Sequence, residues 1–150
     1  MQPATNMPHL SLVQDFAGRF QKARGFPLRE KQYELIEDNS PVKWAELVTG
    51  YGKTDAGIGC FWCAKESGQA DRLLYIGPGS NLPGQFESTV KSYRKTSISI
   101  GDVRRVVNGE TNSIRESLQN QKQVFTTNIQ SVAANPAYYH DLMSKHRWMV

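Results

Sequence analysis

A cluster of basic side chains around one aromatic residue is the part of this sequence with the clearest chemistry. Residues 91–105 contain five lysines and arginines and a single acidic residue, Asp102. Basic groups neutralise backbone phosphates, and an aromatic ring can stack on a nucleobase. We therefore predict a surface that binds nucleic acid, DNA rather than RNA, formed by Lys91, Tyr93, Arg94, Lys95, Arg104 and Arg105. The alternative is an ordinary solvated face.

The glycine-rich connection at residues 50–57 is a second candidate. Its Gly52-Lys53-Thr54 is similar to the end of a phosphate-binding loop, in which backbone N–H groups cradle phosphate oxygens. That pattern requires another glycine five positions before Gly52, where this sequence has Leu47, and a helix directly afterwards. Because we expect a strand to follow, we interpret this segment as a flexible connection.

Residues 59–93 must position any such chemistry. Two apolar runs, at 60–64 and 73–77, are separated by a polar connection that contains glycine. Short apolar runs joined in this way predict a β-hairpin. Apolar residues at helical spacing follow Pro83 and predict a helix to about Lys95.

Two short sequences in this segment resemble the signature of the GIY-YIG nucleases. Tyr75-Ile76-Gly77 matches the end of the family's second strand, and Ser80-Asn81-Leu82 matches the turn before its catalytic helix. A strand predicted over 97–107 and a helix from 111–113 continue the family's order of elements. The resemblance covers residues 57–128. It implies an α+β (mixed α/β) fold, with a small antiparallel three-stranded sheet flanked by helices and an N-terminal helical layer.

The resemblance implies roles for individual residues. Tyr75 takes the place of the second-strand tyrosine, Glu116 that of the glutamate which holds one divalent metal ion, and Asn128 that of an asparagine after the helix. Phe61 and Gln85 stand where the family has a catalytic tyrosine and arginine. Phenylalanine cannot relay a proton, and glutamine brings no charge to the transition state.

These departures decide the function that the resemblance implies. The family hydrolyses phosphodiesters with one Mg²⁺ or Mn²⁺ ion, and loss of one charged stabiliser slows such a reaction about 10²-fold to 10³-fold. A desolvated Lys65 could replace the lost tyrosine as a base. We predict a metal-dependent endonuclease that is weakened or inactive in this copy. The alternative is a non-catalytic module on the same scaffold that binds nucleic acid or protein. Structural roles stay open for the same residues: a helix cap for Glu116, core packing for Tyr75 and a turn for Asn128.

The pentapeptide Gly59-Cys60-Phe61-Trp62-Cys63 supports a different enzyme. It is identical to a segment of the peptide methionine sulfoxide reductases, in which the first cysteine attacks the sulfoxide sulfur from the start of a helix. That resemblance implies a catalytic Cys60. The glutamate-bearing helix and glycine-rich tyrosine segment of that family do not follow, so the reductase is our second alternative.

The remaining sequence predicts helices on both sides of this core. Apolar residues at helical spacing predict helices over 10–24, 27–36 and 40–48, and Asn135-Pro136 begins a helix that runs through Met143. Val124-Phe125 predicts a short strand. We expect a single domain over 1–150, with a helical N-terminal layer at 10–50, a core at 57–128 and a C-terminal helix at 129–150.

Composition supports a folded protein with an anionic partner. The chain has 150 residues, 39% of them hydrophobic, and a formal net charge of +4. No apolar run approaches the roughly 18 residues of a membrane span, and residues 1–9 lack a signal-peptide pattern. We therefore expect a soluble cytoplasmic protein with no membrane partner. Cys60 and Cys63 would point to opposite faces of the predicted strand, which favours reduced thiols.

Overall fold

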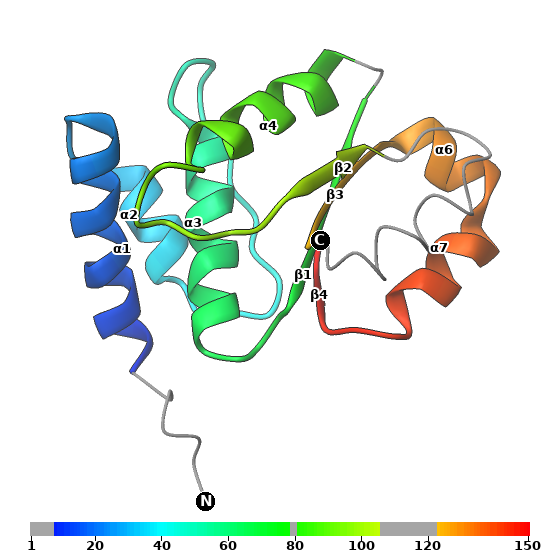
Figure 1. Ribbon diagram of the computed structural model, residues 1–150, viewed down its shortest axis with the longest axis horizontal. Coiled ribbons are helices and arrows are strands. Elements are labelled where there is room, and N and C mark those ends of the chain that lie inside the picture. Colours follow the sequence, from blue (N-terminus) through cyan, green and yellow to red (C-terminus); the bar gives the residue numbers. More distant parts are fainter. Residues whose placement is uncertain (1–7, 79–80, 106–122) are drawn as a thin grey trace, which may run out of the picture.

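A four-stranded parallel sheet separates two groups of helices in the part of the chain that the structure describes (Figure 1). The computed structural model describes residues 8–78, 81–105 and 123–150. All neighbouring strands run parallel, so the carboxyl ends of the three longer strands lie along one edge. The strands are β1 (Arg72–Gly77), β2 (Val103–Arg105), β3 (Val124–Asn128) and β4 (Trp148–Met149), in the spatial order β2-β3-β1-β4.

Helices cover both faces of this sheet (Figure 1). On one side lie α1 (His9–Arg24), α2 (Glu30–Glu37), α3 (Lys53–Glu66) and α4 (Asn81–Ser92). On the other side lie α6 (Ile129–Ala134) and α7 (Pro136–Met143). The sequence predicted α1, α2, α4, α7 and the strand at Val124. It missed α6 and β4.

Both faces of the central strands are buried. Leu73 and Val124 belong to the core that includes α1, α3 and α4, whereas Leu74 and Phe125 pack with Tyr139 and other residues of α7. Strands buried on both faces have continuous apolar runs, and parallel sheets are of this kind. The predicted α+β class with an antiparallel three-stranded sheet is therefore wrong. The fold is α/β.

The first predicted strand of the hairpin lies inside α3. Ala56, Ile58, Phe61, Trp62 and Cys63 are all buried, because α3 packs against α1, α2 and α4. A helix enclosed in this way shows no amphipathic period, so its apolar residues resemble a buried strand. The hairpin prediction is therefore wrong, and β1 pairs in parallel with β3 and β4 instead.

Two other predicted elements differ from the structure. Residues 40–48 form no helix, and Val42 and Trp44 are 83% and 94% exposed. The strand predicted over 97–107 is reduced to β2 within the described residues. The helix predicted from 111–113 lies outside the described residues.

Gly59 allows the close contact of α3 with α1 and α2. A Cβ at this position would lie 2.5 Å from Ile36 Cδ1 and 2.7 Å from Phe16 Cε1, and both of these side chains are fully buried. A Cβ at Gly57, on the same helix, would meet nothing within 4 Å. The helix therefore tolerates a larger residue at one glycine and not at the other.

We predict opposite effects of alanine at these two glycines. Gly59→Ala overpacks the core and should lower the free energy of unfolding by about 1–2 kcal/mol. Gly57→Ala should raise it by up to about 1 kcal/mol, because alanine favours the helix. Urea unfolding of both variants measures the difference. Equal stabilities would contradict the packing described here.

Candidate phosphate-binding and nucleic-acid-binding sites

Residues 50–52 form a loop that leads directly into the first turn of α3, where Lys53 and Thr54 lie. Gly50 and Gly52 have φ angles of 82° and 86°, a backbone conformation that glycine adopts without strain. The helix begins at Lys53, so its first N–H groups have no partners within the helix. Gly52, the N-cap residue, has no side chain to accept their hydrogen bonds. This end of α3 therefore offers free donors and a positive dipole to an anion.

Gln32 holds this loop against the start of α2. Its Nε2 donates to the carbonyl of Gly52 at 3.0 Å, and its Oε1 accepts from the backbone N–H of Arg29 at 2.9 Å. The side chain is 3% exposed. A Cβ on Gly52 would lie 2.3 Å from Gln32 Nε2. Glycine is therefore favoured at this position by its conformation, and a larger residue would also have to displace the Gln32 amide.

The first turn of α2 makes further contacts with the same loop. Arg29 Nη1 donates to the carbonyl of Gly50 at 3.0 Å, and its guanidinium lies 5.1 Å from the centre of the Tyr51 ring. The Tyr51 hydroxyl accepts from the backbone N–H of Lys31 at 3.0 Å. These contacts fix the loop before any ligand binds.

Asp55, in the first turn of α3, joins this helix to α1 and to the end of α4. Its Oδ1 accepts from Arg24 Nη2 at 3.0 Å and from the Tyr93 hydroxyl. Arg24 also donates to Ser92 Oγ at 2.8 Å, and its guanidinium lies 4.1 Å from the centre of the Tyr93 ring. Arg24 offsets the charge of the carboxylate through Oδ1, whereas Oδ2 lies on the side of Gly52, 3.9 Å from the position that a Cβ would take there.

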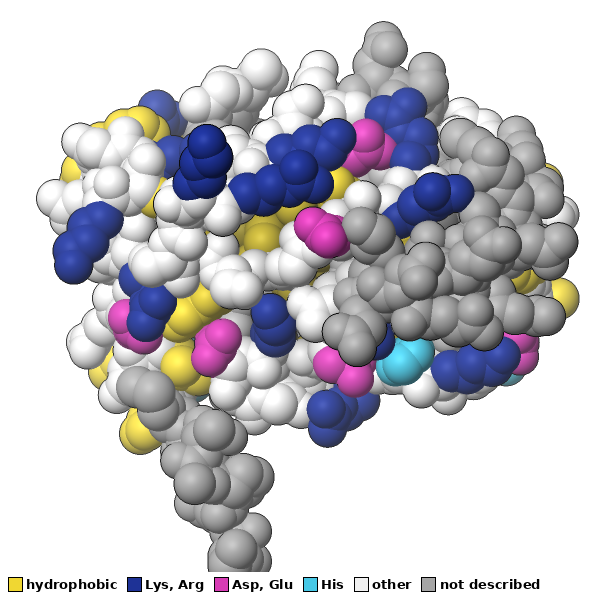
Figure 2. Space-filling model, viewed as in Figure 1, with side chains coloured by type: hydrophobic (Ala, Val, Ile, Leu, Met, Phe, Trp, Pro, Cys, Tyr) yellow, Lys and Arg dark blue, Asp and Glu magenta, His cyan; other side chains and the backbone are white. Residues whose placement is uncertain are grey.

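The predicted basic surface is only partly assembled as expected. Lys91, Arg94 and Lys95 are exposed at the end of α4 and just after it. Figure 2 shows basic side chains gathered along this edge of the molecule. Tyr93 is 1% exposed and one face of its ring carries Arg24, so it lies in the core beneath these charges and does not form an open stacking surface.

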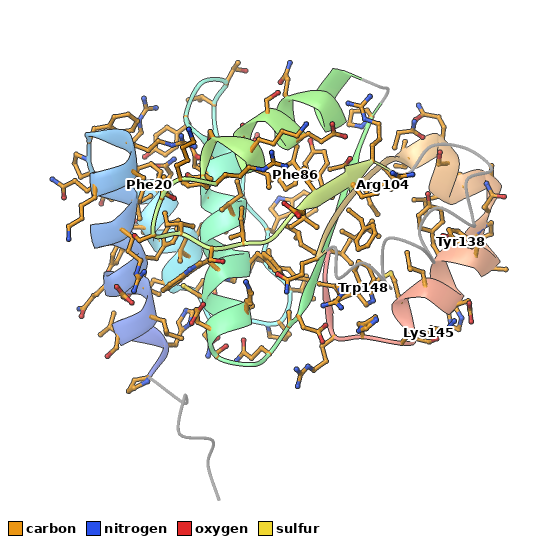
Figure 3. All side chains as sticks on the ribbon, viewed as in Figure 1. Phe20, Phe86, Arg104, Tyr138, Lys145 and Trp148 are labelled. Atoms are coloured by element: carbon orange, nitrogen blue, oxygen red, sulfur yellow. The ribbon has the colours of Figure 1, made fainter. Side chains whose placement is uncertain are left out.

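Arg104 and Arg105 lie on β2 and are half-buried. Arg105 Nε donates to Glu87 Oε1 at 2.7 Å, and the Thr126 hydroxyl donates to the same oxygen at 2.9 Å. These bonds tie α4 to β2 and β3. Arg104, labelled in Figure 3, extends from β2. Arg105 is thus engaged in a structural ion pair, whereas the three exposed cations face solvent.

The residues carried over from the GIY-YIG resemblance lie on separate elements. Phe61 is fully buried on α3, and the Tyr75 ring stacks on Phe86 with 4.2 Å between centroids. Gln85 is exposed on α4, and Asn128 caps α6 by accepting from the Ser131 N–H at 2.7 Å. Asn128 is therefore the N-cap of α6, whereas the structural role that the sequence left open for it was a turn. Glu116, the predicted metal ligand, lies outside the described residues.

Lys65 and Cys60 were proposed as reactive groups. Burial lowers the pKa of Lys65, but its Nζ donates to the carbonyl of Ser99 at 3.1 Å, at the far end of α3 from the loop. Cys60 lies in the middle of α3, and burial raises its pKa even though Lys43 Nζ is 3.6 Å from its sulfur. A reductase nucleophile needs the reverse, a lowered pKa at a helix start. Burial also raises the pKa of Cys63, to about 12.

Residues 8–78, 81–105 and 123–150 contain no group of three or more histidine, cysteine, aspartate or glutamate side chains that could hold a metal ion. No helix within these ranges combines the length and apolar character needed to cross a membrane.

A parallel α/β sheet with a glycine-rich loop at the start of a helix is typical of proteins that bind phosphate groups. A family model described as "Type III restriction enzyme, res subunit" (ResIII) matches residues 16–150, nearly the whole chain. The chain belongs to this family, a helicase-like family with a phosphate-binding loop that acts on DNA. No curated protein matches the chain. The GIY-YIG assignment is therefore wrong.

The sequence indicated a flexible connection at residues 50–57, whereas the family match favours a phosphate-binding loop there. Two features of the sequence supported the phosphate-binding interpretation. The apolar region of residues 56–64 is longer than a usual strand, which favours a helix, and Lys53-Thr54-Asp55 suits a first helical turn. Gln32 carried no signal of its own, because only the fold brings it to Gly52.

We predict that Tyr93 makes stability depend on alkaline pH. Burial and the hydrogen bond to Asp55 raise the pKa of Tyr93 above its ordinary value of 10.0. A raised folded-state pKa stabilises the fold fully below about pH 10, and this contribution is lost as the pH rises further. Tyr93→Phe should lower the free energy of unfolding by about 1.5 kcal/mol at neutral pH and flatten its decline above about pH 10.

Denaturant unfolding at several pH values provides this measurement. Tyr33→Phe, which removes a phenol from α2, serves as the matched control. Parallel curves for wild type and Tyr93→Phe across the alkaline range would show that the hydroxyl does not hold Asp55.

Proposed function

We propose that the chain binds a nucleoside triphosphate at Gly50–Thr54 and couples its hydrolysis to action on nucleic acid. The observation that carries this proposal is the helix start at Lys53, held by the two glycines and by Gln32. The family match supports the same conclusion, because the family is helicase-like and acts on DNA. An anion that approaches this end of α3 meets backbone donors in a fixed arrangement.

Each residue of the segment has a chemical role in this proposal. The N–H groups of the first turn bind phosphate oxygens, and the Lys53 ammonium neutralises the terminal phosphates. The Thr54 hydroxyl holds the Mg²⁺ ion that accompanies a triphosphate. Leu47 stands where such loops have a first glycine, and no strand or helix occupies residues 38–52. Because no strand leads into the loop, the contacts with α2 are what hold its shape.

Nucleic acid would bind the exposed cations after α4. Lys91, Arg94 and Lys95 lie close together, and Arg94 Nη2 is 3.7 Å from Asp102 Oδ1. A phosphate backbone can replace this half-exposed ion pair at little cost, because such pairs contribute about 0–1 kcal/mol. Arg24 and Tyr93 connect this region to Asp55 in the first turn of α3.

We predict that Lys53→Ala weakens nucleotide binding and slows hydrolysis. The variant should bind a fluorescent ATP analogue at least tenfold more weakly and hydrolyse ATP about 10²-fold to 10³-fold more slowly, since it lacks a charged stabiliser. Lys145→Ala, which removes a lysine near the end of α7 (Figure 3), is the matched control. Equal nucleotide affinity in wild type and Lys53→Ala would refute the phosphate site.

We predict that Lys95→Ala weakens DNA binding through phosphate contact. Affinity should fall equally for unrelated sequences, and the slope of log K against log salt should decrease by about 0.7–0.9, the effect of one phosphate contact. Fluorescence anisotropy over a salt series measures both quantities, again with Lys145→Ala as control. An unchanged slope would remove Lys95 from the nucleic-acid surface.

A further inference from the structure

A pocket of about 460 Å³ lies between the end of α4 and the segment that returns from it to β2. Figure 1 shows this segment turning back beneath α4 before it enters the sheet. The pocket volume falls within the range of small-ligand sites, about 300–1,000 Å³. Its walls are formed by Val90, Tyr93, Arg94, Thr96, Ile98, Ser99, Ile100, Gly101, Asp102 and Gln123.

The lining combines an apolar part with polar groups of both kinds. Val90, Ile98 and Ile100 form its floor but are only 1–3% exposed, so the surface open to a ligand is mainly polar. Arg94 supplies donors, Asp102 supplies acceptors, and the Gln123 amide supplies both. A flat heterocycle with donors and acceptors on its edge, such as a nucleobase, matches this arrangement.

The returning segment is held firmly, so the pocket exists before a ligand binds. Arg19 Nη1 donates to the carbonyl of Ser97 at 2.9 Å, and Lys65 Nζ donates to that of Ser99 at 3.1 Å. Gly101 has a φ of 91°, and a Cβ there would lie 2.5 Å from Gln123 Oε1. The Asp102 carbonyl accepts from the N–H of Val124 at 3.1 Å. A preformed pocket binds without the cost of ordering its walls.

We propose that this pocket takes one base of a single-stranded nucleic acid. The inference rests on the nucleic-acid part of the proposed function. The strand is favoured over a free nucleotide because Lys91, Arg94 and Lys95 lie at or next to the pocket and would bind successive phosphates of a backbone. In Figure 2 apolar side chains are visible below the basic side chains of this edge. A base unstacked from the strand would enter the pocket and meet the polar groups of Arg94, Asp102 and Gln123, while its phosphates stay on the cations.

The test compares strands with and without bases. Fluorescence anisotropy measures binding of labelled oligothymidylate of about 12 nucleotides, a length within the usual range of binding-site sizes, and of an abasic strand of equal length and charge. Ser99 is exposed and lines the pocket, so Ser99→Leu places a larger side chain in it. The hydrogen bond from Lys65 to the carbonyl of residue 99 is unaffected by this change. Ser97→Leu is the matched control, because Ser97 is also exposed, is also held by its carbonyl and lies outside the pocket wall.

Wild type and Ser97→Leu should bind the base-containing strand about tenfold more tightly than the abasic strand. Ser99→Leu should lose this preference while its affinity for the abasic strand stays unchanged. If Ser99→Leu keeps the tenfold preference, the proposal is overturned. It is also overturned if wild type shows no such preference, and this second result does not depend on the folding of any variant.

Two further outcomes separate the possible sources of failure. Thymidine 5′-monophosphate is added as a competitor. If this nucleotide binds wild type but not Ser99→Leu, and the two strands bind wild type equally well, the pocket takes a free nucleotide and not a base of a strand. No binding of either strand by wild type would overturn the nucleic-acid part of the proposed function along with the pocket. The Lys53→Ala experiment reports on the phosphate loop independently of both.

Discussion

The interaction of Asp55 with Arg24 and Tyr93 is the constraint on which the arrangement of the sites depends. A carboxylate in the first turn of α3 would repel phosphate if it faced the loop, although it suits the helix dipole. Arg24 and Tyr93 bind its Oδ1 and so offset its charge, and they join α1, α3 and the end of α4, while Oδ2 stays on the side of Gly52. The same tyrosine lines the pocket beside the exposed cations. Tyr93 thus links the two proposed sites. A change in the position of α4 would move Tyr93 and alter its hydrogen bond to Asp55.

The parallel sheet explains how these helices are placed. Its strands are buried on both faces, so α3 and α4 can pack on one side while α7 closes the other. Glu87 accepts hydrogen bonds from Arg105 and Thr126, which fixes α4 relative to β2 and β3. The exposed cations at the end of α4 therefore stand on a rigid support. A binding surface built on such a support keeps its geometry when a ligand arrives.

Prediction from sequence succeeded where a pattern is local. The period of α1 and its stop at Gly25, the cap and proline of α7, and the apolar pair Val124-Phe125 each identified an element that the structure contains. It failed at residues 59–77, because a helix buried on all sides and a strand buried on both faces have the same apolar composition. The wrong strand then led to the GIY-YIG resemblance and to the rejection of the loop at Gly52.

The sequence by itself determined the residue types available for chemistry: a glycine-lysine-threonine segment, a basic cluster after residue 90 and no membrane-length apolar run. Only the tertiary structure decided which of them meet. Gln32 lies twenty residues before Gly52 and bonds to it, Tyr93 reaches Asp55 from 38 residues away, and the pocket joins Arg94 to Gln123. Such contacts depend on how helices pack across a sheet, and no local pattern of residues records that packing.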